Sequence, residues 1–422
     1  MPARRLRAAG AACLRTEAIV YVRWVLDSLH RRPRGRELAA LLAVLSRGRV
    51  PSPLAPQALA LRAQQQDRRL AELERRDAAN TVVHNHLRMR EALAQIALGW
   101  SLDRHDVPAW PAELGPASRT LLDALGADGQ AAVLAALPRA DRELIEASPA
   151  VVGSRRLVGY GAARAVPLVL ERTRLLAVEP PAEIHAMCRG PDCVAGSIET
   201  ADLVLGVLER AGFTLAAGAR ALDFGCSSGR VTRVLAAVRP EVAWLGCDPN
   251  RAAIDWAAAK LPVAEFFGND QEPPLQLDSG TLDMVCGISI WSHFDAVAAL
   301  RWLAEMHRVL RPGGVLVLTA AGLANVAVLT RDWEVPAEYA RAAWAALSTT
   351  GFWWADAFGA NGDWGVAHPR WGSAYLTPEW LLARILPDWS LRLYEPGRLL
   401  GVQDVYVLER SDGPQTPAAG GE

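Results

Sequence analysis

One stretch of ten residues constrains the fold of this chain more than any other feature. Residues 221–230 read ALDFGCSSGR, an apolar strand that runs into a turn of small residues, with a helix expected to begin near Arg230. Small residues let the backbone approach a ligand closely, and the first turn of a helix presents free N–H groups. A dinucleotide-binding fingerprint requires glycine at positions 227 and 230, where serine and arginine stand. The stretch therefore predicts a ligand-binding turn of another type.

The rest of the C-terminal half continues in the order expected of a parallel α/β sheet. From Glu179 onward, apolar runs alternate with helical stretches. A second strand ends in Asp248, where an acid can accept hydrogen bonds from both hydroxyls of a ribose. Asn269 and Asp270 end the next expected strand. The other expected strands are Ala219–Phe224, Ala243–Cys247, Leu282–Gly287, Val315–Ala320, Leu391–Tyr394 and Asp404–Leu408.

These motifs resemble those of the class I S-adenosylmethionine (SAM) methyltransferases. The spacing Asp-x-Gly-x-small-x-Gly over residues 223–229 is similar to motif I of that family, with serine in place of the usual middle glycine. The turn Leu-Arg-Pro-Gly-Gly over residues 310–314 is also typical of it. The resemblance covers about residues 182–410 and implies an α/β fold with a Rossmann-like, seven-stranded sheet and SAM as the cofactor. The cofactor-binding residues it implies are Asp223, Gly225, Ser227, Gly229, Asp248, Asn269 and Asp270.

Within this superfamily, the nearest likeness is to methyltransferases of bacterial polysaccharide and other glycoconjugate pathways. Asn269 followed by Pro-Pro-Leu at 273–275, the stretch Ser289–His293 and the strand Gln403–Leu408 carry it. The likeness implies O-methylation of a glycan or a small molecule by in-line methyl transfer, in which the enzyme aligns acceptor and sulfonium carbon. Two alternatives stay open: methylation of a natural product or a protein, and a non-catalytic SAM-fold scaffold whose helical region binds a partner.

A long segment rich in tryptophan and glycine, residues 322–388, interrupts the expected sheet before its last two strands. It holds seven of the fifteen tryptophans of the chain. Because tryptophan faces stack well on sugar rings and aromatic acceptors, we expect a substrate lid, with a satellite hydrophobic core as the alternative. The tryptophans expected to contact the acceptor are Trp291, Trp353, Trp354, Trp364 and Trp371.

A hydroxyl acceptor also needs a base to remove its proton, and two histidines are the candidates. His293 follows the expected fourth strand, and His368 lies in the tryptophan-rich segment. Each could equally be a structural histidine, and Asp356 and Asp363 come after them as candidates. No metal is expected, because His185, Cys188 and Cys193 are not followed by a second ligand pair at zinc-site spacing.

The six cysteines are too sparse for a disulfide framework, so we expect buried or free thiols and a reducing cytoplasm. The basic and acidic side chains nearly cancel, 45 against 46, which argues against a nucleic-acid partner. Lys260 is the only lysine, and its neighbours Ala259 and Leu261 exclude a P-loop. Trp256 stands where a short-chain dehydrogenase needs tyrosine, and kinases are excluded because the chain has no strand lysine and no His-Arg-Asp loop.

The N-terminal half offers architecture and no chemistry. Residues 1–56 read as a basic amphipathic helical segment with a linker, and 57–178 as mainly helical, with a long helix over about 57–98. Nine arginines within residues 1–36 predict either peripheral binding to the inner face of an anionic membrane or a helix pair with a solvated basic face. Residues 179–410 form the methyltransferase domain, and 411–422 a disordered tail. The oligomeric state stays open.

Overall fold

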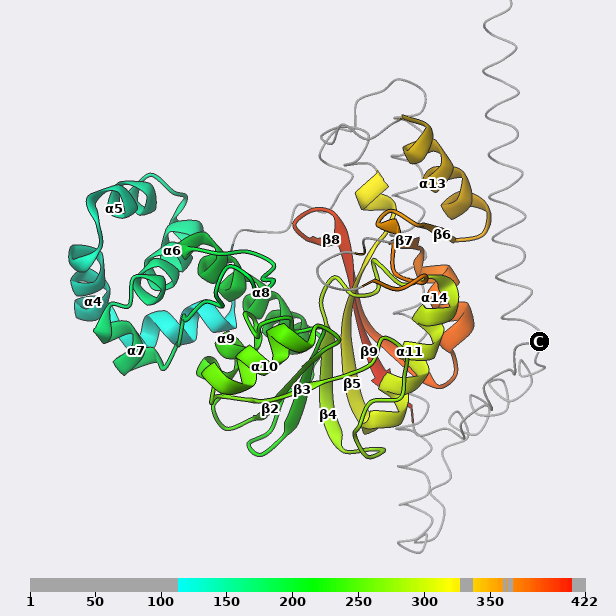
Figure 1. Ribbon diagram of the computed structural model, residues 1–422, viewed down its shortest axis with the longest axis horizontal. Coiled ribbons are helices and arrows are strands. Elements are labelled where there is room, and N and C mark those ends of the chain that lie inside the picture. The colour runs from blue at the N-terminus through cyan, green and yellow to red at the C-terminus, as the bar shows by residue number, and fades with distance from the viewer. Residues whose placement is uncertain (1–112, 327–336, 360–361, 363–366, 412–422) are drawn as a thin grey trace, which may run out of the picture. The chain divides into compact units, whose positions relative to one another are not determined.

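The computed structural model describes residues 113–326, 337–359, 362 and 367–411 (Figure 1). The chain divides into two compact units, 1–70 and 71–422, and every described residue belongs to the second. The expectations for residues 1–36, the helix over 57–98, Asp363, Trp364 and the tail beyond Ser411 therefore lie outside the described residues. None of the described helices combines the length and the apolar character needed to cross a membrane.

A twisted sheet of mostly parallel strands organises the described residues. Its main part has the order β3-β2-β1-β4-β5-β9-β8, in which β1 to β5 run parallel and β9 is antiparallel to both of its neighbours. The predicted fold class, a Rossmann-like α/β sheet, is thereby confirmed. The strands are β1 (Arg220–Phe224), β2 (Ala243–Asp248), β3 (Glu265–Gly268), β4 (Leu282–Gly287), β5 (Leu310–Ala321), β8 (Trp389–Leu399) and β9 (Gln403–Arg410).

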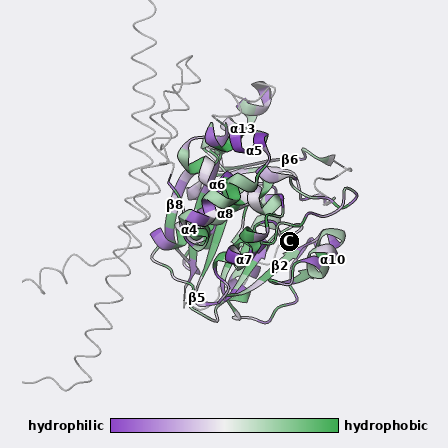
Figure 2. Cartoon of the chain, turned by 90° about the vertical axis from the view of Figure 1, so that its left-hand side faces the viewer, coloured by the Kyte–Doolittle hydropathy of each residue, from purple (hydrophilic) through white to green (hydrophobic). Residues whose placement is uncertain are grey.

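Helices cover both faces of this sheet, each over its own hydrophobic core. One core lies between the sheet and a group of helices from the N-terminal side of the chain: α4 (Pro116–Ala136), α5 (Arg139–Glu146), α6 (Ala150–Ala163), α7 (Pro167–Thr173), α8 (Pro191–Arg210) and α9 (Thr232–Val238). The other core lies under α11 (Ala296–Val309) and α14 (Pro378–Ile385). Figure 2 shows the hydrophobic residues along the sheet and hydrophilic ones on outer helices such as α5. α10 (Arg251–Lys260) packs beside β2 and β3.

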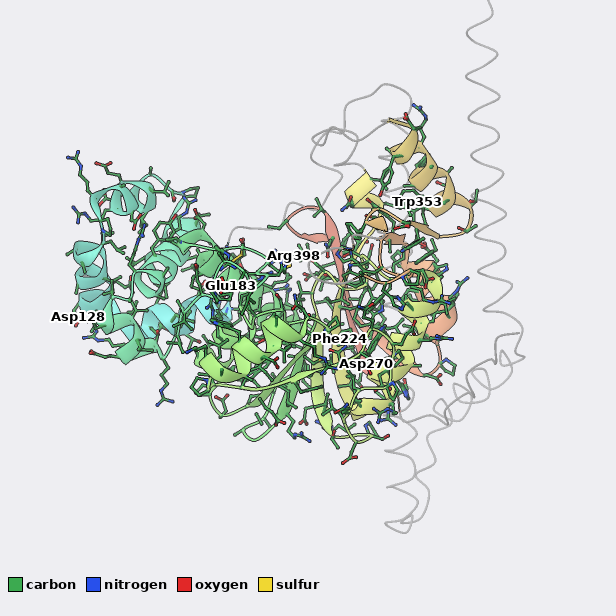
Figure 3. The ribbon with its side chains drawn as sticks, viewed as in Figure 1. Asp128, Glu183, Phe224, Asp270, Trp353 and Arg398 are labelled. Atoms are coloured by element: carbon green, nitrogen blue, oxygen red, sulfur yellow. A yellow bond between two sulfur atoms is a disulfide. The ribbon has the colours of Figure 1, made fainter. Side chains whose placement is uncertain are left out.

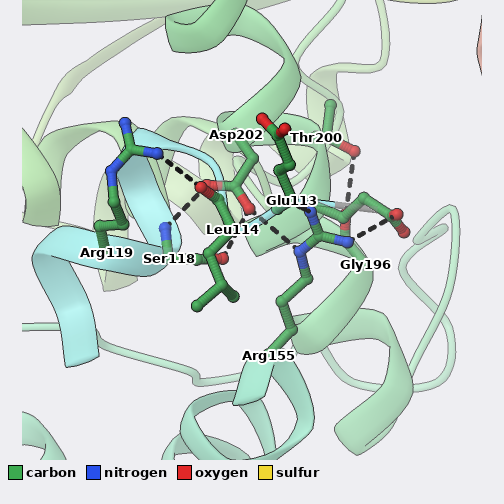
Figure 4. Close-up of polar contacts among 9 residues, drawn as sticks. Glu113, Leu114, Ser118, Arg119, Arg155, Gly196, Thr200 and Asp202 are labelled. Atoms are coloured by element: carbon green, nitrogen blue, oxygen red, sulfur yellow. Dashed lines mark hydrogen bonds and ion pairs between the residues drawn. The ribbon is translucent and has the colours of Figure 1, made fainter. Parts of the chain in front are cut away.

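The helical region before residue 179 shares its core with the sheet. Leu121 of α4 and Val204 of α8 belong to the same buried cluster as Ala221 of β1 and Val405 of β9. A buried carboxylate, Asp202, ties the helices together: the backbone N–H and the hydroxyl of Ser118 donate to it over 2.7 and 2.5 Å (Figure 4). Helices α4, α6 and α8 are therefore held as one block, because Arg155 of α6 also donates to Asp202, over 3.0 Å.

The tryptophan-rich segment contributes elements that we did not predict. Strands β6 (Phe352–Ala355) and β7 (Ser373–Leu376) form an antiparallel pair that joins the main sheet at the end of β5, where Tyr375 pairs with Ala321. With α13 (Ala337–Thr349), this pair encloses a small hydrophobic core that includes Ala343 and Leu347. The alternative that we considered for these residues, a satellite core, describes this part of the segment.

Candidate functional site

A cavity opens at the carboxyl ends of β1, β2, β3 and β4. It encloses about 1060 Å³ of empty space, including its open mouth. Phe224, the last residue of β1, and Asp270, two residues after β3, both line it and are labelled in Figure 3. Six of the seven residues predicted to bind the cofactor line this cavity: Asp223, Gly225, Ser227, Asp248, Asn269 and Asp270.

The turn after β1 forms one wall of the cavity. Gly225 and Ser227 have φ angles of +80° and +50°, and the N–H groups of Gly225 and Cys226 donate to the carbonyl of Cys247 over 2.9 and 3.0 Å. A Cβ atom at Gly225 would lie 2.2 Å from the side chain of Ile290, so only glycine fits there. Gly229, also at positive φ, does not line the cavity, because it packs against Leu261 and Phe266.

Asp248 lies at the end of β2, beside this turn. One carboxylate oxygen accepts the N–H of Ser227 and the other accepts the N–H of Asn250, both over 2.8 Å. Burial raises the pKa of the Asp248 carboxyl, while these two hydrogen bonds lower it. A carboxylate can accept about four hydrogen bonds. Asp248 therefore keeps capacity for the hydroxyls of a ligand.

Asp223, next to the last residue of β1, contacts the start of α9 and β4 and so supports the turn. The Thr232 hydroxyl donates to one of its oxygens over 2.6 Å, and the Cys286 thiol lies 3.8 Å from the other. Burial raises the pKa of Asp223, and the nearby Arg230 guanidinium opposes that rise. The aspartate thus joins β1, the start of α9 and β4.

Four buried polar atoms of residues that line the cavity lack a hydrogen-bond partner within the described part of the chain. Two are oxygens, the hydroxyl of Ser227 and the side-chain oxygen of Asn269, and two are the indole nitrogens of Trp302 and Trp371. Buried polar groups are almost always hydrogen-bonded, so unpaired ones in a cavity wall indicate a polar ligand. With Asp248 and the glycine turn, they fit a ligand that carries a ribose, a base and a further polar end, as SAM does.

His293 does not line the cavity. Its Nδ1 lies 2.9 Å from the carbonyl of Gly372, and its ring stacks on Trp371 at a centroid distance of 4.5 Å. Burial lowers the pKa of His293 to about 4. These contacts attach the tryptophan-rich segment to the loop after β4. They are the contacts of a structural histidine, the alternative to a catalytic base that the sequence left open for His293.

His368 does line the cavity. Its Nδ1 accepts the N–H of Arg370 over 3.2 Å, so in the neutral ring the proton is on Nε2, 3.6 Å from a carboxylate oxygen of Glu272. Sequence reasoning missed Glu272, which meets His368 only through the fold, and Arg370, whose N–H bonds His368 from two residues away. Asp356, by contrast, is exposed and accepts the N–H of Gly359.

The tryptophans predicted to contact the acceptor separate into two groups. Of the four that the structure describes, only Trp371 lines the cavity. Trp291 is fully buried, and its indole N–H points at the carbonyl of Ala299, 3.3 Å away. Trp353 packs edge to face on Tyr339 in the small core, apart from the cavity in Figure 3, and Trp354 donates to the backbone of His293.

One structural feature contradicts the expectation for the cysteines. Cys188 and Cys193 form a disulfide, so they are not free thiols. The chain reverses at Gly190, at a φ of +80°, which brings the two Cα atoms within 5.4 Å, a normal distance for a disulfide. The other three cysteines described, Cys226, Cys247 and Cys286, are free and buried.

The disulfide links α8 to the end of a preceding segment that sequence reasoning did not connect to the site. We call residues 179–190 the strap. Arg189 donates to the carbonyls of Pro180, Pro181 and Ile184 and so holds the strap in shape. Met187 of the strap lines the cavity.

Comparison with known proteins defines the class of this domain. Residues 221–314 match the family model described as a methyltransferase domain. A malonyl-[acyl-carrier protein] O-methyltransferase of Alcanivorax borkumensis is 29% identical over 118 residues, which are 27% of this chain and 39% of that protein. A phthiotriol/phenolphthiotriol dimycocerosates methyltransferase of Mycobacterium ulcerans is 32% identical over 122 residues, 28% of this chain and 42% of the relative. The chain thus spans about two fifths of these curated relatives.

Among solved structures, a SAM-dependent methyltransferase of Methanosarcina mazei superposes with a TM-score of 0.34 and 19% identity, over 47% of this chain and 94% of its own. Residues 221–314 thus match a methyltransferase domain, and the sheet order around them is the Rossmann-like order expected from the motifs. The cofactor of this class is S-adenosylmethionine.

Proposed function

We propose that this protein is a SAM-dependent methyltransferase that methylates a hydroxyl group of a glycan or of a small molecule. The observation that carries the proposal is the juxtaposition of the Gly225 turn with Asp248 in one cavity. The unpaired oxygens of Ser227 and Asn269 in the same wall add support. Activity of the whole chain and its acceptor are part of the proposal, because the family match covers only residues 221–314.

When bound, the cofactor supplies an electrophilic methyl group, and the chain has to align it with the acceptor. The turn after β1 and Asp248 hold the cofactor at one end of the cavity. The other lining residues are largely aromatic or aliphatic, among them Ile290, Phe294 and Trp371. Such a wall excludes water from the acceptor and favours an apolar or ring-shaped group beside the methyl group.

His368 is the better placed of the two histidines to receive the proton of the acceptor, because it lines the cavity and His293 does not. In this role Nδ1 exchanges its hydrogen bond from Arg370 for one from the acceptor hydroxyl. The resulting imidazolium is stabilised by Glu272, which lies 3.6 Å from Nε2.

Methylation of a natural product is the second candidate. The apolar lining of the cavity favours it, and both curated relatives described above are named as methyltransferases of acyl-type or lipid-like molecules. Cytoplasmic location, membrane association through residues 1–36 and oligomerisation stay predictions.

Titration calorimetry with S-adenosylhomocysteine tests the cofactor assignment. The wild-type chain should bind, and Asp248→Ala should weaken binding by about 1–3 kcal/mol, since it leaves the ribose hydroxyls unpaired in the cavity. Asp255→Ala is the matched control, because Asp255 lies exposed on α10 and does not line the cavity. No binding by the wild type would contradict the proposal. Binding without methyl transfer to any member of a panel of glycans and hydroxylated small molecules would favour the scaffold instead.

A further inference from the structure

Three aromatic side chains line the cavity together. Phe294, Trp302 and Trp371, which we call the aromatic wall, come from the loop after β4, from α11 and from the segment that leads into β7. The ring of Phe294 stacks on Trp302 at a centroid distance of 6.1 Å and meets Trp371 edge to face at 5.5 Å. His293 also stacks on Trp371, at 4.5 Å. The rings therefore support one another and form an apolar surface that exists before a ligand binds.

Two members of the aromatic wall carry a buried N–H group that is unpaired. The indole nitrogens of Trp302 and Trp371 have no hydrogen-bond partner among the described residues. Nearby, the indole N–H groups of Trp291 and Trp354 donate to backbone carbonyls, so the fold does satisfy such groups elsewhere. An indole N–H can only donate. A ligand that completes the wall therefore has to offer an acceptor atom, such as an oxygen.

The polar side chains beside the wall are already used by the fold. Arg370 donates to Asp295 over 2.8 Å, and the Ser289 hydroxyl donates to Gln403 over 3.2 Å. A sugar ring carries several hydroxyls, and each of them costs free energy when it leaves water without a partner of its own. An aromatic ring needs only apolar contacts for its faces. The wall is therefore better suited to an aromatic ring than to a sugar.

Trp371 and His368 are held close to each other. They lie three residues apart, and the backbone N–H of Trp371 donates to the carbonyl of His368 over 3.0 Å. Both side chains line the cavity. One short turn thus supplies a hydrogen-bond donor and the base of the proposed function, which suits an acceptor with two oxygens, a hydroxyl and a second oxygen that accepts a hydrogen bond.

We propose that the acceptor is a phenol that carries a carbonyl group on its ring system. The inference rests on the proposed function and narrows its acceptor to aromatic molecules. The ring lies against the aromatic wall, the carbonyl accepts the N–H of Trp371, and the hydroxyl lies at His368. A phenol has a pKa of about 10, as tyrosine does, so a single histidine can take its proton. The phenol oxygen bonds to the methyl carbon, and the electron pair of the broken sulfur–carbon bond stays on sulfur.

Two naphthols of similar shape test this acceptor class on the full chain in the presence of SAM. The compound 6-acetyl-2-naphthol has the hydroxyl, the aromatic rings and a carbonyl, whereas 6-isopropyl-2-naphthol lacks the carbonyl. Mass spectrometry should show methyl transfer to both. The acetyl compound should have a kcat/KM about tenfold higher, the gain from one hydrogen bond to an otherwise unpaired group. Methyl glucoside, the sugar probe, should not be methylated.

Trp371→Phe tests whether the preference comes from the indole N–H, because phenylalanine keeps an aromatic face and lacks the donor. The ratio of kcat/KM for the acetyl and isopropyl compounds should fall by about tenfold. Trp353→Phe is the matched control. It is the same exchange in the same segment, but Trp353 packs on Tyr339 and does not line the cavity, so the ratio should stay at the wild-type value. An unchanged ratio in Trp371→Phe would overturn the role of its N–H group.

The same assays separate failure of this inference from failure of the proposed function. A glucoside methylated as fast as the naphthols would overturn the aromatic acceptor and leave the methyltransferase in place. Methyl transfer to none of the probes, by a chain that binds S-adenosylhomocysteine in calorimetry, would also overturn the aromatic acceptor. If the chain does not bind S-adenosylhomocysteine, the proposed function itself fails.

Discussion

Asp404 shows how a single buried side chain makes the stability of this protein depend on pH. It lies on β9 and accepts hydrogen bonds from the Tyr394 hydroxyl and the N–H of Gly397, both over 2.8 Å. Burial raises its pKa to about 6, despite these two bonds. The folded chain thus holds this proton more tightly than the unfolded chain, in which an aspartate has a pKa of about 3.9.

The sign of the effect follows from this difference. The contribution of Asp404 to stability is fully present below about pH 4 and is lost as the pH rises through about 6, by at most about 3 kcal/mol. Asp404→Asn should lack this contribution. Denaturant unfolding at several pH values should therefore show that the difference in unfolding free energy between wild type and variant changes between about pH 4 and 6. A difference that is constant from pH 4 to 7 would contradict the assignment.

The two histidines should respond differently to substitution. At saturating SAM, His368→Ala should lower turnover by about 100-fold or more and leave the affinity for S-adenosylhomocysteine unchanged, because only proton removal is lost. His293→Ala should instead lower the unfolding midpoint, since it removes the contacts to Gly372 and Trp371. Steady-state kinetics and thermal unfolding of both variants measure this contrast. Normal turnover in His368→Ala would mean that the acceptor is already nucleophilic.

The site residues that could be predicted from the sequence are those that lie at or next to the ends of strands. Asp223 lies in β1, Asp248 ends β2 and Asn269 follows β3, so the order of the strands along the chain was enough to place them. His368 and Trp371 depend on the path of the tryptophan-rich segment through space, which no local pattern encodes.

At the scale of elements, the strap connects cofactor binding to a disulfide. Cys188 is exposed and Cys193 is buried at the start of α8, so the bond joins the strap to a helix of the core. Ile184 of the strap also packs against the cluster of Trp256 and Leu261. When the disulfide is reduced, Ile184 still holds the strap against this cluster, but the strap is less ordered. A ligand then binds more weakly, because binding also has to order the strap.

We therefore expect a reducing agent to weaken binding of S-adenosylhomocysteine, by about tenfold or less. Cys188→Ser should bind as weakly as the reduced wild type and should not respond to the reductant, which makes it the control. Calorimetry of both proteins, with and without the reductant, measures the effect. Equal affinity of the oxidised and the reduced wild type would show that the strap does not depend on the disulfide.

Elements were predicted best where an apolar run stands out from polar neighbours. Strand β4 was predicted with its observed bounds, because an apolar run preceded by polar residues marks it clearly. The pair of β6 and β7 was missed, because each strand has four residues and its partner is distant in sequence. Periodicity within one strand does not reveal such a partner.

For the whole molecule, the shared core predicts that the helical region and the sheet unfold together. The side chain of Asp202 is 4% exposed and that of its partner Arg155 is 13% exposed. Asp202→Ala removes one of the two carboxylates that pair with Arg155 and leaves the buried Ser118 hydroxyl unpaired, so it should destabilise the chain by about 3 kcal/mol. Asp128→Ala is the matched control, because Asp128 also pairs with an arginine, Arg172, but is 77% exposed. It should change stability by about 1 kcal/mol or less.

Two optical signals distinguish joint from separate unfolding. Twelve of the fifteen tryptophans lie beyond residue 179, and none lies between residues 113 and 178, so tryptophan fluorescence follows mainly the sheet and its insertion. In Asp202→Ala, the fluorescence transition should shift together with the far-ultraviolet circular dichroism of the helices. A fluorescence midpoint equal to that of the wild type would mean that residues 179–410 fold independently of the helices before them.

The attachment of the tryptophan-rich segment also bears on how such a protein can evolve. The part of the segment that leads into β7 is joined to the loop after β4 by backbone hydrogen bonds of 2.8 to 3.0 Å. The N–H groups of Gly372, Ala374 and Asp295 donate to the carbonyls of His293, Ser292 and Arg370, respectively. Bonds between main-chain atoms persist when side chains are exchanged. Side chains of this segment can therefore change during evolution and alter which acceptors are tolerated, while the turn after β1 keeps its geometry.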